Sequence, residues 1–172
     1  MANAGDELVF APLGGVGEIG MNLAIYVAMT LGSFAVIITM KRNGQAVENI
    51  SDFAGLSRTN PLLAFVFAML LFSLAGIPPL AGFFAKFYVF LAAIKAGLFA
   101  LAVLGVLASV VGAYYYLVIV KIMYFDEPAK AFEPMPGELQ AVLGASGLFN
   151  LLFFVYPGPL IEAATVAAKS LF

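Results

Sequence analysis

The stretch Leu74–Val89, "LAGIPPLAGFFAKFYV", decides the fold of this chain. It places two adjacent prolines, two glycines and one lysine inside the otherwise almost wholly apolar run Pro61–Lys95. A straight helix over that run would be roughly 50 Å long, because each helical residue adds about 1.5 Å. The hydrocarbon core of a bilayer is only about 30 Å thick, so the run must tilt, protrude or break.

The prolines and glycines favour a break. Four residues define it: Gly76, Pro78, Pro79 and Gly82. Proline lacks an N–H donor and clashes with the preceding turn, while glycine permits irregular backbone. We expect a half-helix at Pro61–Ala75, an unwound link at Gly76–Gly82 and a second half-helix at Phe83–Lys95. Non-helical backbone at membrane depth must be buried in protein or line water, which predicts that this segment lies inside a bundle.

The composition supports a membrane environment. The chain is 63% hydrophobic and 10% charged, with a mean hydropathy of +1.05. Besides Pro61–Lys95 it has three long apolar segments, at about Gly20–Met40, Leu98–Phe125 and Leu139–Ala168. Each is long enough to span a bilayer, which takes about 20 helical residues. The sequence therefore predicts an all-α, polytopic membrane helix bundle of about four transmembrane helices, the second of them discontinuous.

We expect a single membrane domain over residues 1–172, with a polar N-terminal loop at residues 1–19. If the helices alternate in direction, the basic residues other than Lys86 divide five to two between the two sides of the membrane. The larger group is Lys41, Arg42, Arg58, Lys121 and Lys130, and the smaller is Lys95 and Lys169. The positive-inside tendency places the larger group in the cytoplasm and both termini on the outer side.

Lys86 is the main candidate functional residue. A lysine in mid-membrane costs at least about 2.5 kcal/mol, so it should face an interior partner or a hydrated cavity. Snorkelling to the interface fits Lys95 and Lys121, but Lys86 lies nine residues before Lys95, where the segment ends. Burial disfavours its charged form, whereas carbonyl groups freed by the break favour it. We therefore interpret Lys86 as a proton relay.

Weaker candidates lie on the first and third helices. A polar face follows the first helix at intervals of three or four residues: Glu18, Asn22, Tyr26, Thr30 and Ser33. It could line a water path, with Glu18, Tyr26 and Thr30 as proton-path candidates, or it could pack against a neighbouring helix, which is commoner.

The third helix carries three consecutive tyrosines, Tyr114 to Tyr116, of which at most two can face a polar interior. Tyr115 is our candidate among them. The small residues Gly105, Ser109 and Gly112 of the same helix are most simply interpreted as a packing surface.

The residue inventory excludes several classes of chemistry. Because the sequence contains no Cys and no His, it offers no thiolate nucleophile, iron–sulfur ligands or imidazole metal site. The motif "GVGEIG" at residues 15–20 has glycine spacing similar to a dinucleotide fingerprint but lacks its βαβ context. A net charge of -2 without a basic stripe makes nucleic acid an unsuitable partner. We expect no cofactor and no metal in this chain, and the lipid bilayer as its surroundings.

Two stretches resemble a known family: "SLAGIPPLAGFFAKFYVF" at residues 73–90 and "GAYYYLVIVKIMYFDEP" at residues 112–128. They are similar to the C-terminal part of subunit N of the proton-pumping NADH-quinone oxidoreductase, respiratory complex I, in the antiporter-like membrane subunit family. The resemblance implies an antiporter-like fold with two inverted repeats, of which this chain is similar to the last four helices. Pro61–Lys95 then corresponds to the discontinuous helix of the second repeat, and Lys86 to its proton-channel lysine.

The resemblance also implies a location and partners. It implies the bacterial inner membrane, a role in an H⁺-translocating NADH:ubiquinone reductase, and FMN, iron–sulfur clusters and quinone held by other subunits. The expected partners are the other membrane subunits of complex I and further N-terminal helices of the family's fold. Two alternatives stay open: a subunit of a multisubunit cation/proton antiporter, and a non-catalytic membrane scaffold in which the polar groups only pack.

Overall fold

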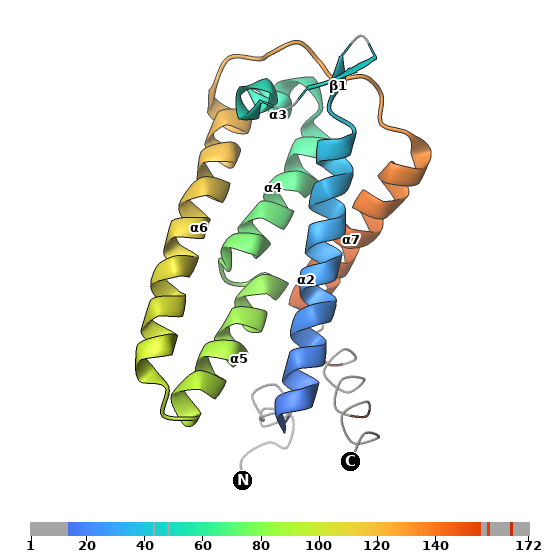
Figure 1. The fold of residues 1–172 in the computed structure, drawn as a ribbon. Coiled ribbons are helices and arrows are strands. Elements are labelled where there is room, and N and C mark those ends of the chain that lie inside the picture. Colours follow the sequence, from blue (N-terminus) through green and yellow to red (C-terminus); the bar gives the residue numbers. More distant parts are fainter. Residues whose placement is uncertain (1–13, 43, 48, 156–157, 159–165, 167–172) are drawn as a thin grey trace.

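A computed structural model describes residues 14–42, 44–47, 49–155, 158 and 166, with side chains from Gly20 onward except at Phe154. The described part is a bundle of helices with a small hairpin at one end (Figure 1). Its elements are α2 (Gly14–Ile38), β1 (Lys41–Arg42), β2 (Gln45–Ala46), η1 (Ile50–Phe53), α3 (Leu56–Thr59), α4 (Pro61–Ala75), α5 (Ala81–Lys95), α6 (Phe99–Phe125) and α7 (Gly137–Val155).

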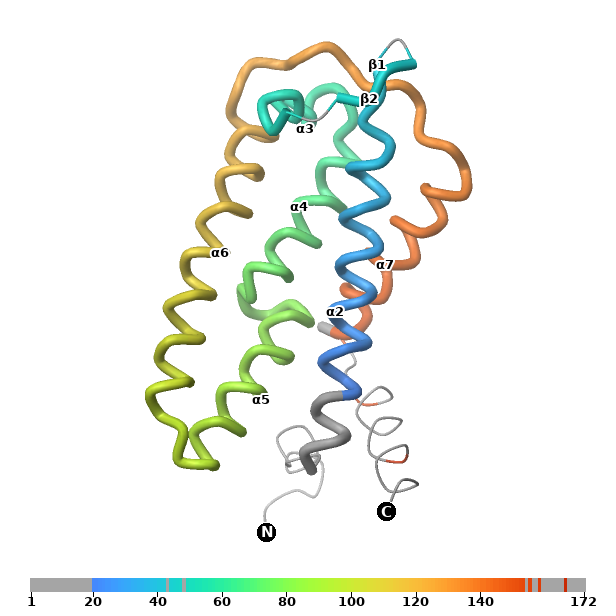
Figure 2. Tube along the Cα trace, viewed as in Figure 1, coloured from blue at the N-terminus to red at the C-terminus, as the bar shows by residue number. Residues whose placement is uncertain are grey.

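Helices α4 and α5 follow one another along the bundle and are separated by residues 76–80 (Figure 2). Local signals define α4: the Asn60 side chain accepts a hydrogen bond from the Leu63 N–H at 3.2 Å, and Pro61 occupies the first turn. The helix ends at Gly76, whose φ of +84° is a left-handed conformation that favours glycine. Helix α5 begins at Ala81, so the link is two residues shorter than the predicted Gly76–Gly82.

Two other predicted bounds differ from the structure. Helix α2 begins at Gly14, so the prediction of a loop over residues 1–19 is wrong for residues 14–19, and residues 1–13 lie outside the described residues. Three of the six residues from 14 to 19 are glycine, each about 1 kcal/mol less favourable than alanine in a helix, so the helix there runs against the local preference of the sequence. Helix α7 covers Gly137–Val155, and most of the remainder of the predicted fourth segment lies outside the described residues.

The helices pack around two clusters of buried apolar side chains. One joins α4 to α2 and α6 and includes Phe67, Leu70 and Met123. The other joins α2 to α5 beside the break and includes Ile25 and Ala85. The break therefore lies between two packed regions of the bundle.

Two of the described helices are long and apolar enough to cross a membrane, Gly20–Ile38 and Phe99–Phe125, while Pro61–Ala75 is apolar but shorter. Helix α6 is apolar around its whole circumference and yet largely exposed within this chain. A helix of that kind requires lipid or other helices around it rather than water.

Long-range contacts close one end of the bundle, where the hairpin, η1, α3 and the loop after α6 meet (Figure 1). Arg42 forms an ion pair with Asp52 and lies over the Phe132 ring, 4.8 Å from its centroid. The Gly44 N–H donates to the Glu133 carboxylate at 2.7 Å. We call this set of contacts the loop cap.

Candidate functional site

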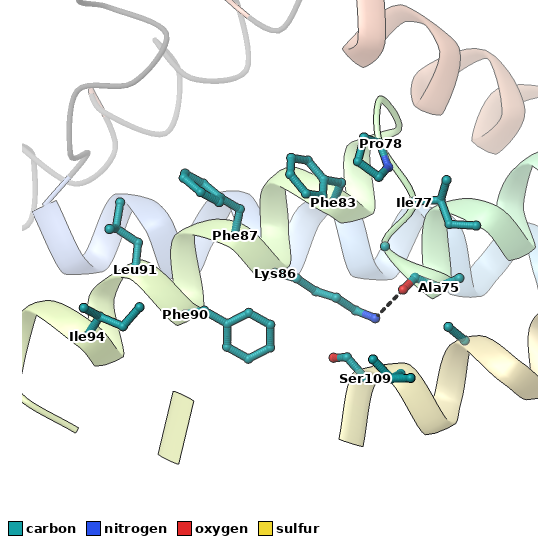
Figure 3. A pocket seen from close by; sticks show the side chains of 13 residues that line it. Ala75, Ile77, Pro78, Phe83, Lys86, Phe87, Phe90, Leu91, Ile94 and Ser109 are labelled. Carbon is teal, nitrogen blue, oxygen red and sulfur yellow. Dashed lines mark hydrogen bonds between the residues drawn. The ribbon is translucent and has the colours of Figure 1, made fainter. Parts of the chain in front are cut away.

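Lys86 lies at the break and points back toward the end of α4. Its Nζ donates a hydrogen bond to the Ala75 carbonyl oxygen at 2.9 Å (Figure 3). Ala75 is the last residue of α4, and carbonyl groups in a final helical turn lack intrahelical donors. The carbonyl end of a helix carries partial negative charge, so this contact stabilises the ammonium form.

Among the residues whose side chains are described, the ion pairs are Arg42–Asp52 and Lys121–Asp126. Neither involves Lys86. The partner that the described structure supplies to this lysine is therefore a backbone dipole rather than a carboxylate.

Two pockets meet at Lys86. The first, of about 420 Å³, extends from the break between α5 and α6, and most of its lining is apolar, including Phe87 and Phe90 (Figure 3). The second, of about 330 Å³, lies among α2, α4, α5 and α6. Its polar lining residues are Asn22, Tyr26, Ser73, Lys86, Ser109 and Tyr116. Lys86 and Ser109 line both pockets, so they stand where a path between the two would run.

The structure brings some predicted site residues together and leaves others apart. Tyr26 lines the second pocket beside Lys86. Thr30 is half-buried and lines neither pocket, and Tyr115 is 63% exposed and also lines neither. Tyr116, its neighbour, faces the second pocket instead. Glu18 belongs to α2 by its backbone, and its side chain lies outside the described part of the chain.

Ser109 and Tyr116 line the second pocket but are not among the site residues that the sequence predicts. Ser109 was assigned to a packing surface because small residues usually mark close helix contacts. The sequence does contain a signal for a pocket at Ser109. Its hydroxyl lies on one helix face with two glycines, and such a face leaves room for water as well as for a neighbouring helix.

A hydrogen-bond network holds the break. Ser73 Oγ on α4 donates to Asn150 Oδ1 on α7 at 3.0 Å. The Ala81 N–H at the start of α5 donates to the same Asn150 oxygen at 3.3 Å, and the Gly82 N–H donates to Ser73 Oγ at 2.9 Å. Asn150 is not among the site residues that the sequence predicts, although a single amide within the apolar stretch "GLFNLLFFV" at residues 147–155 indicates a buried polar contact.

The part of the chain that the structure describes contains no group of three or more His, Cys, Asp or Glu side chains that could hold a metal ion. The chemistry available at the break thus consists of one amine, several hydroxyls, amides and backbone dipoles. The amine can gain or lose a proton, and the hydroxyls, amides and backbone groups can form hydrogen bonds to it and to water.

An apolar helical bundle with an interrupted helix is typical of membrane transport proteins. The chain belongs to the proton-antiporter family described as NADH:quinone oxidoreductase/Mrp antiporter, TM, whose family model matches residues 8–112. It is accordingly a multi-pass membrane protein with the antiporter-like fold that the sequence predicted.

Among its relatives is NADH-quinone oxidoreductase subunit N of Parvibaculum lavamentivorans, which is 65% identical over 91% of this chain and 33% of the relative. The subunit N of Methylobacterium nodulans is 58% identical over 100% of this chain and 36% of the relative. The fold is also similar to a chain of a solved structure, respiratory complex I from Thermus thermophilus with bound Aureothin. That match has a TM-score of 0.75 and 31% identity, and covers 88% of this chain and 35% of that one. The chain thus spans about a third of the length of the curated relatives it matches.

Proposed function

We propose that this chain forms part of the membrane arm of an H⁺-translocating NADH:ubiquinone reductase, in which Lys86 relays protons beside the break. The observation that carries the proposal is the position of Lys86, whose Nζ donates to the Ala75 carbonyl oxygen and which lines both pockets. The relatives named NADH-quinone oxidoreductase subunit N support the assignment to this complex. The chain would act in the bacterial inner membrane with both termini on the outer side.

In this proposal the electron-transfer chemistry belongs to other subunits. FMN, iron–sulfur clusters and quinone are expected there from the resemblance to complex I, and this sequence, with neither Cys nor His, offers no iron–sulfur ligands. The partners would be the other membrane subunits and further helices of the same fold. This chain would contribute part of a proton path.

Lys86 is suited to a relay because its two protonation states would have different partners. The protonated amine is stabilised by the Ala75 carbonyl and by the negative end of α4. Once deprotonated, the amine loses most of that attraction and can accept a proton from water in the second pocket. The hydroxyls of Tyr26, Ser109 and Tyr116 can each donate and accept hydrogen bonds, so they can support a water chain to the amine.

The test replaces Lys86 in the complete subunit of the assembled complex. Lys86→Met keeps a side chain of similar length without charge, and Lys86→Arg keeps the charge but cannot release a proton. A relay requires a switch, so both variants should lower proton pumping by at least about a hundredfold, the lower end of the range typical of lost acid–base catalysis. Lys95→Arg and Lys95→Met, at the exposed end of α5, serve as matched controls.

Pumping and the NADH:quinone reductase rate would be measured in membranes, with the subunit content checked by blotting. Wild-type pumping by Lys86→Arg would contradict the relay and leave Lys86 as a structural cation. The family description also names Mrp antiporters, so cation/proton exchange would be measured in vesicles without NADH. Exchange under those conditions would favour the antiporter alternative.

A further inference from the structure

We propose that Asn150 on α7 is a positioning residue that sets the geometry of the break, and through it the place of Lys86. The consequence for proton transfer rests on the proposed function above. The geometric claim does not, because it concerns the spacing of α4 and α5 alone.

One oxygen atom of Asn150 connects both sides of the break to a third helix. It accepts from Ser73 Oγ in the last turn of α4 and from the Ala81 N–H in the first turn of α5. Ser73 Oγ in turn accepts from the Gly82 N–H. The two helix ends are therefore joined to each other and to α7 by three hydrogen bonds.

These bonds satisfy groups that have no other acceptor within their helix. The first N–H groups of any helix lack intrahelical partners, and those of Ala81 and Gly82 are buried within the bundle. Asn150 and Ser73 are both 0% exposed, and Asn150 lines neither of the two pockets at Lys86, so the described structure offers water no access to the Asn150 oxygen. Removing the Asn150 oxygen would leave buried donors unpaired, which disfavours the present spacing of α4 and α5.

Packing transmits the position of Asn150 to α5. Phe153, one turn after Asn150 on α7, contacts Phe84 on α5 with ring centroids 5.8 Å apart. Lys86 lies two residues beyond Phe84, and its hydrogen bond to Ala75 spans the same break. That bond keeps its length only while the ends of α4 and α5 keep their spacing.

The test uses cysteine labelling in the complete subunit within the assembled complex. This chain contains no cysteine, so an introduced one is unique within it. Ile77→Cys reports on the break, and Ile94→Cys reports on the far part of the same pocket. The rate of alkylation by N-ethylmaleimide would be followed by mass spectrometry of the peptide that contains each cysteine.

Each reporter is combined with Asn150→Leu or Asn150→Asp. Leucine has a similar shape but no acceptor. Aspartate keeps the acceptor oxygen in both its neutral and its ionised form, so it can still accept from the Ala81 N–H. We expect Asn150→Leu to raise the labelling rate at position 77 about fivefold, the ratio that corresponds to about 1 kcal/mol for one hydrogen bond. Asn150→Asp should keep the wild-type rate, and position 94 should be unaffected in both.

Unchanged labelling at position 77 in Asn150→Leu would overturn the proposal. So would an equal rise in Asn150→Asp, since the acceptor would then be irrelevant, or an equal rise at position 94, which would indicate general loosening. Ser73→Ala, a smaller change, should also raise labelling at position 77, and it keeps the test available if Asn150→Leu fails to assemble. Unchanged labelling with Ser73→Ala would count against the proposal as well.

Proton pumping by the same variants separates the two proposals. Increased labelling at position 77 with normal pumping would support the positioning role of Asn150 and contradict the relay role of Lys86. Increased labelling together with reduced pumping in Asn150→Leu, and neither effect in Asn150→Asp, would support both.

Discussion

Gly76 and Lys86 lie in direct contact across the break. A Cβ atom at position 76 would come within 2.8 Å of Lys86 Cδ and 3.3 Å of Lys86 Nζ. Gly76 also has a φ of +84°, which side chains other than glycine rarely adopt. The glycine thus permits both the end of α4 and the return of the lysine onto its last carbonyl.

Gly76→Ala should therefore displace Lys86 and reduce proton pumping. We expect a loss of about 1–2 kcal/mol in stability from the left-handed backbone alone, and a fall in pumping from the displaced amine. Gly97→Ala is the matched control, because Gly97 has a similar φ of +75° but nothing within 4 Å of an added Cβ. Comparable pumping defects in the two variants would show that contact with Lys86 is not the cause.

Tyr116→Phe should reduce pumping while Tyr115→Phe should not. Both changes remove one hydroxyl and keep the ring, but Tyr116 lines the second pocket and Tyr115 is 63% exposed away from it. We expect about a fivefold effect at position 116, which corresponds to one lost hydrogen bond in the water path. The measurement is the number of protons pumped per quinone reduced. A larger effect at position 115 would show that the path runs elsewhere.

Arg42→Met should destabilise the loop cap. The Arg42 and Asp52 side chains are each 18% exposed, so the change leaves a largely buried carboxylate without its charged donor. We expect a loss of about 1.5–3 kcal/mol in the free energy of unfolding, measured by SDS titration in detergent micelles. Lys121→Met removes the exposed pair with Asp126 and should cost less than about 1 kcal/mol. Equal losses would indicate that the loop cap adds no particular stability.

A pair of cysteines at opposite ends of the bundle can test which end faces the cytoplasm. Gln45 lies in the hairpin beside the basic residues Lys41 and Arg42, and Ala96 lies in the turn between α5 and α6. With the basic end in the cytoplasm, an impermeant thiol reagent should label Ala96→Cys in intact cells. It should label Gln45→Cys only in inverted vesicles. The reverse pattern would place the termini inside.

Local sequence signals predicted the bounds of α4 but not the start of α5. Asn60 and Pro61 begin α4 and Gly76 ends it, and each acts on its own stretch of backbone. Helix α5 starts at Ala81 where Asn150, far along the chain, supplies an acceptor for its first N–H. Such a contact depends on the packing of α7, which local propensity does not specify.

The choice between Tyr115 and Tyr116 has a similar explanation. Successive residues on a helix point about 100° apart, so the sequence predicts that some tyrosine faces inward without indicating which one. The rotation of α6 is set by contacts with α4 and α5, including those around Met123. The loop cap also depends on tertiary packing. Arg42 and Phe132 become neighbours only because α6 returns the chain to the end of the bundle where Arg42 lies.

The loop cap gives the bundle a mechanical asymmetry. At the end of the bundle where the loop cap lies, hydrogen bonds and an ion pair cross-link segments that are far apart in the sequence. At the opposite end, α5 and α6 are joined by the short turn at residues 96–98, where Gly97 has open space around its Cα. Among the described residues, the loop cap therefore joins its segments through long-range polar contacts, whereas α5 and α6 at the opposite end are joined by the chain itself.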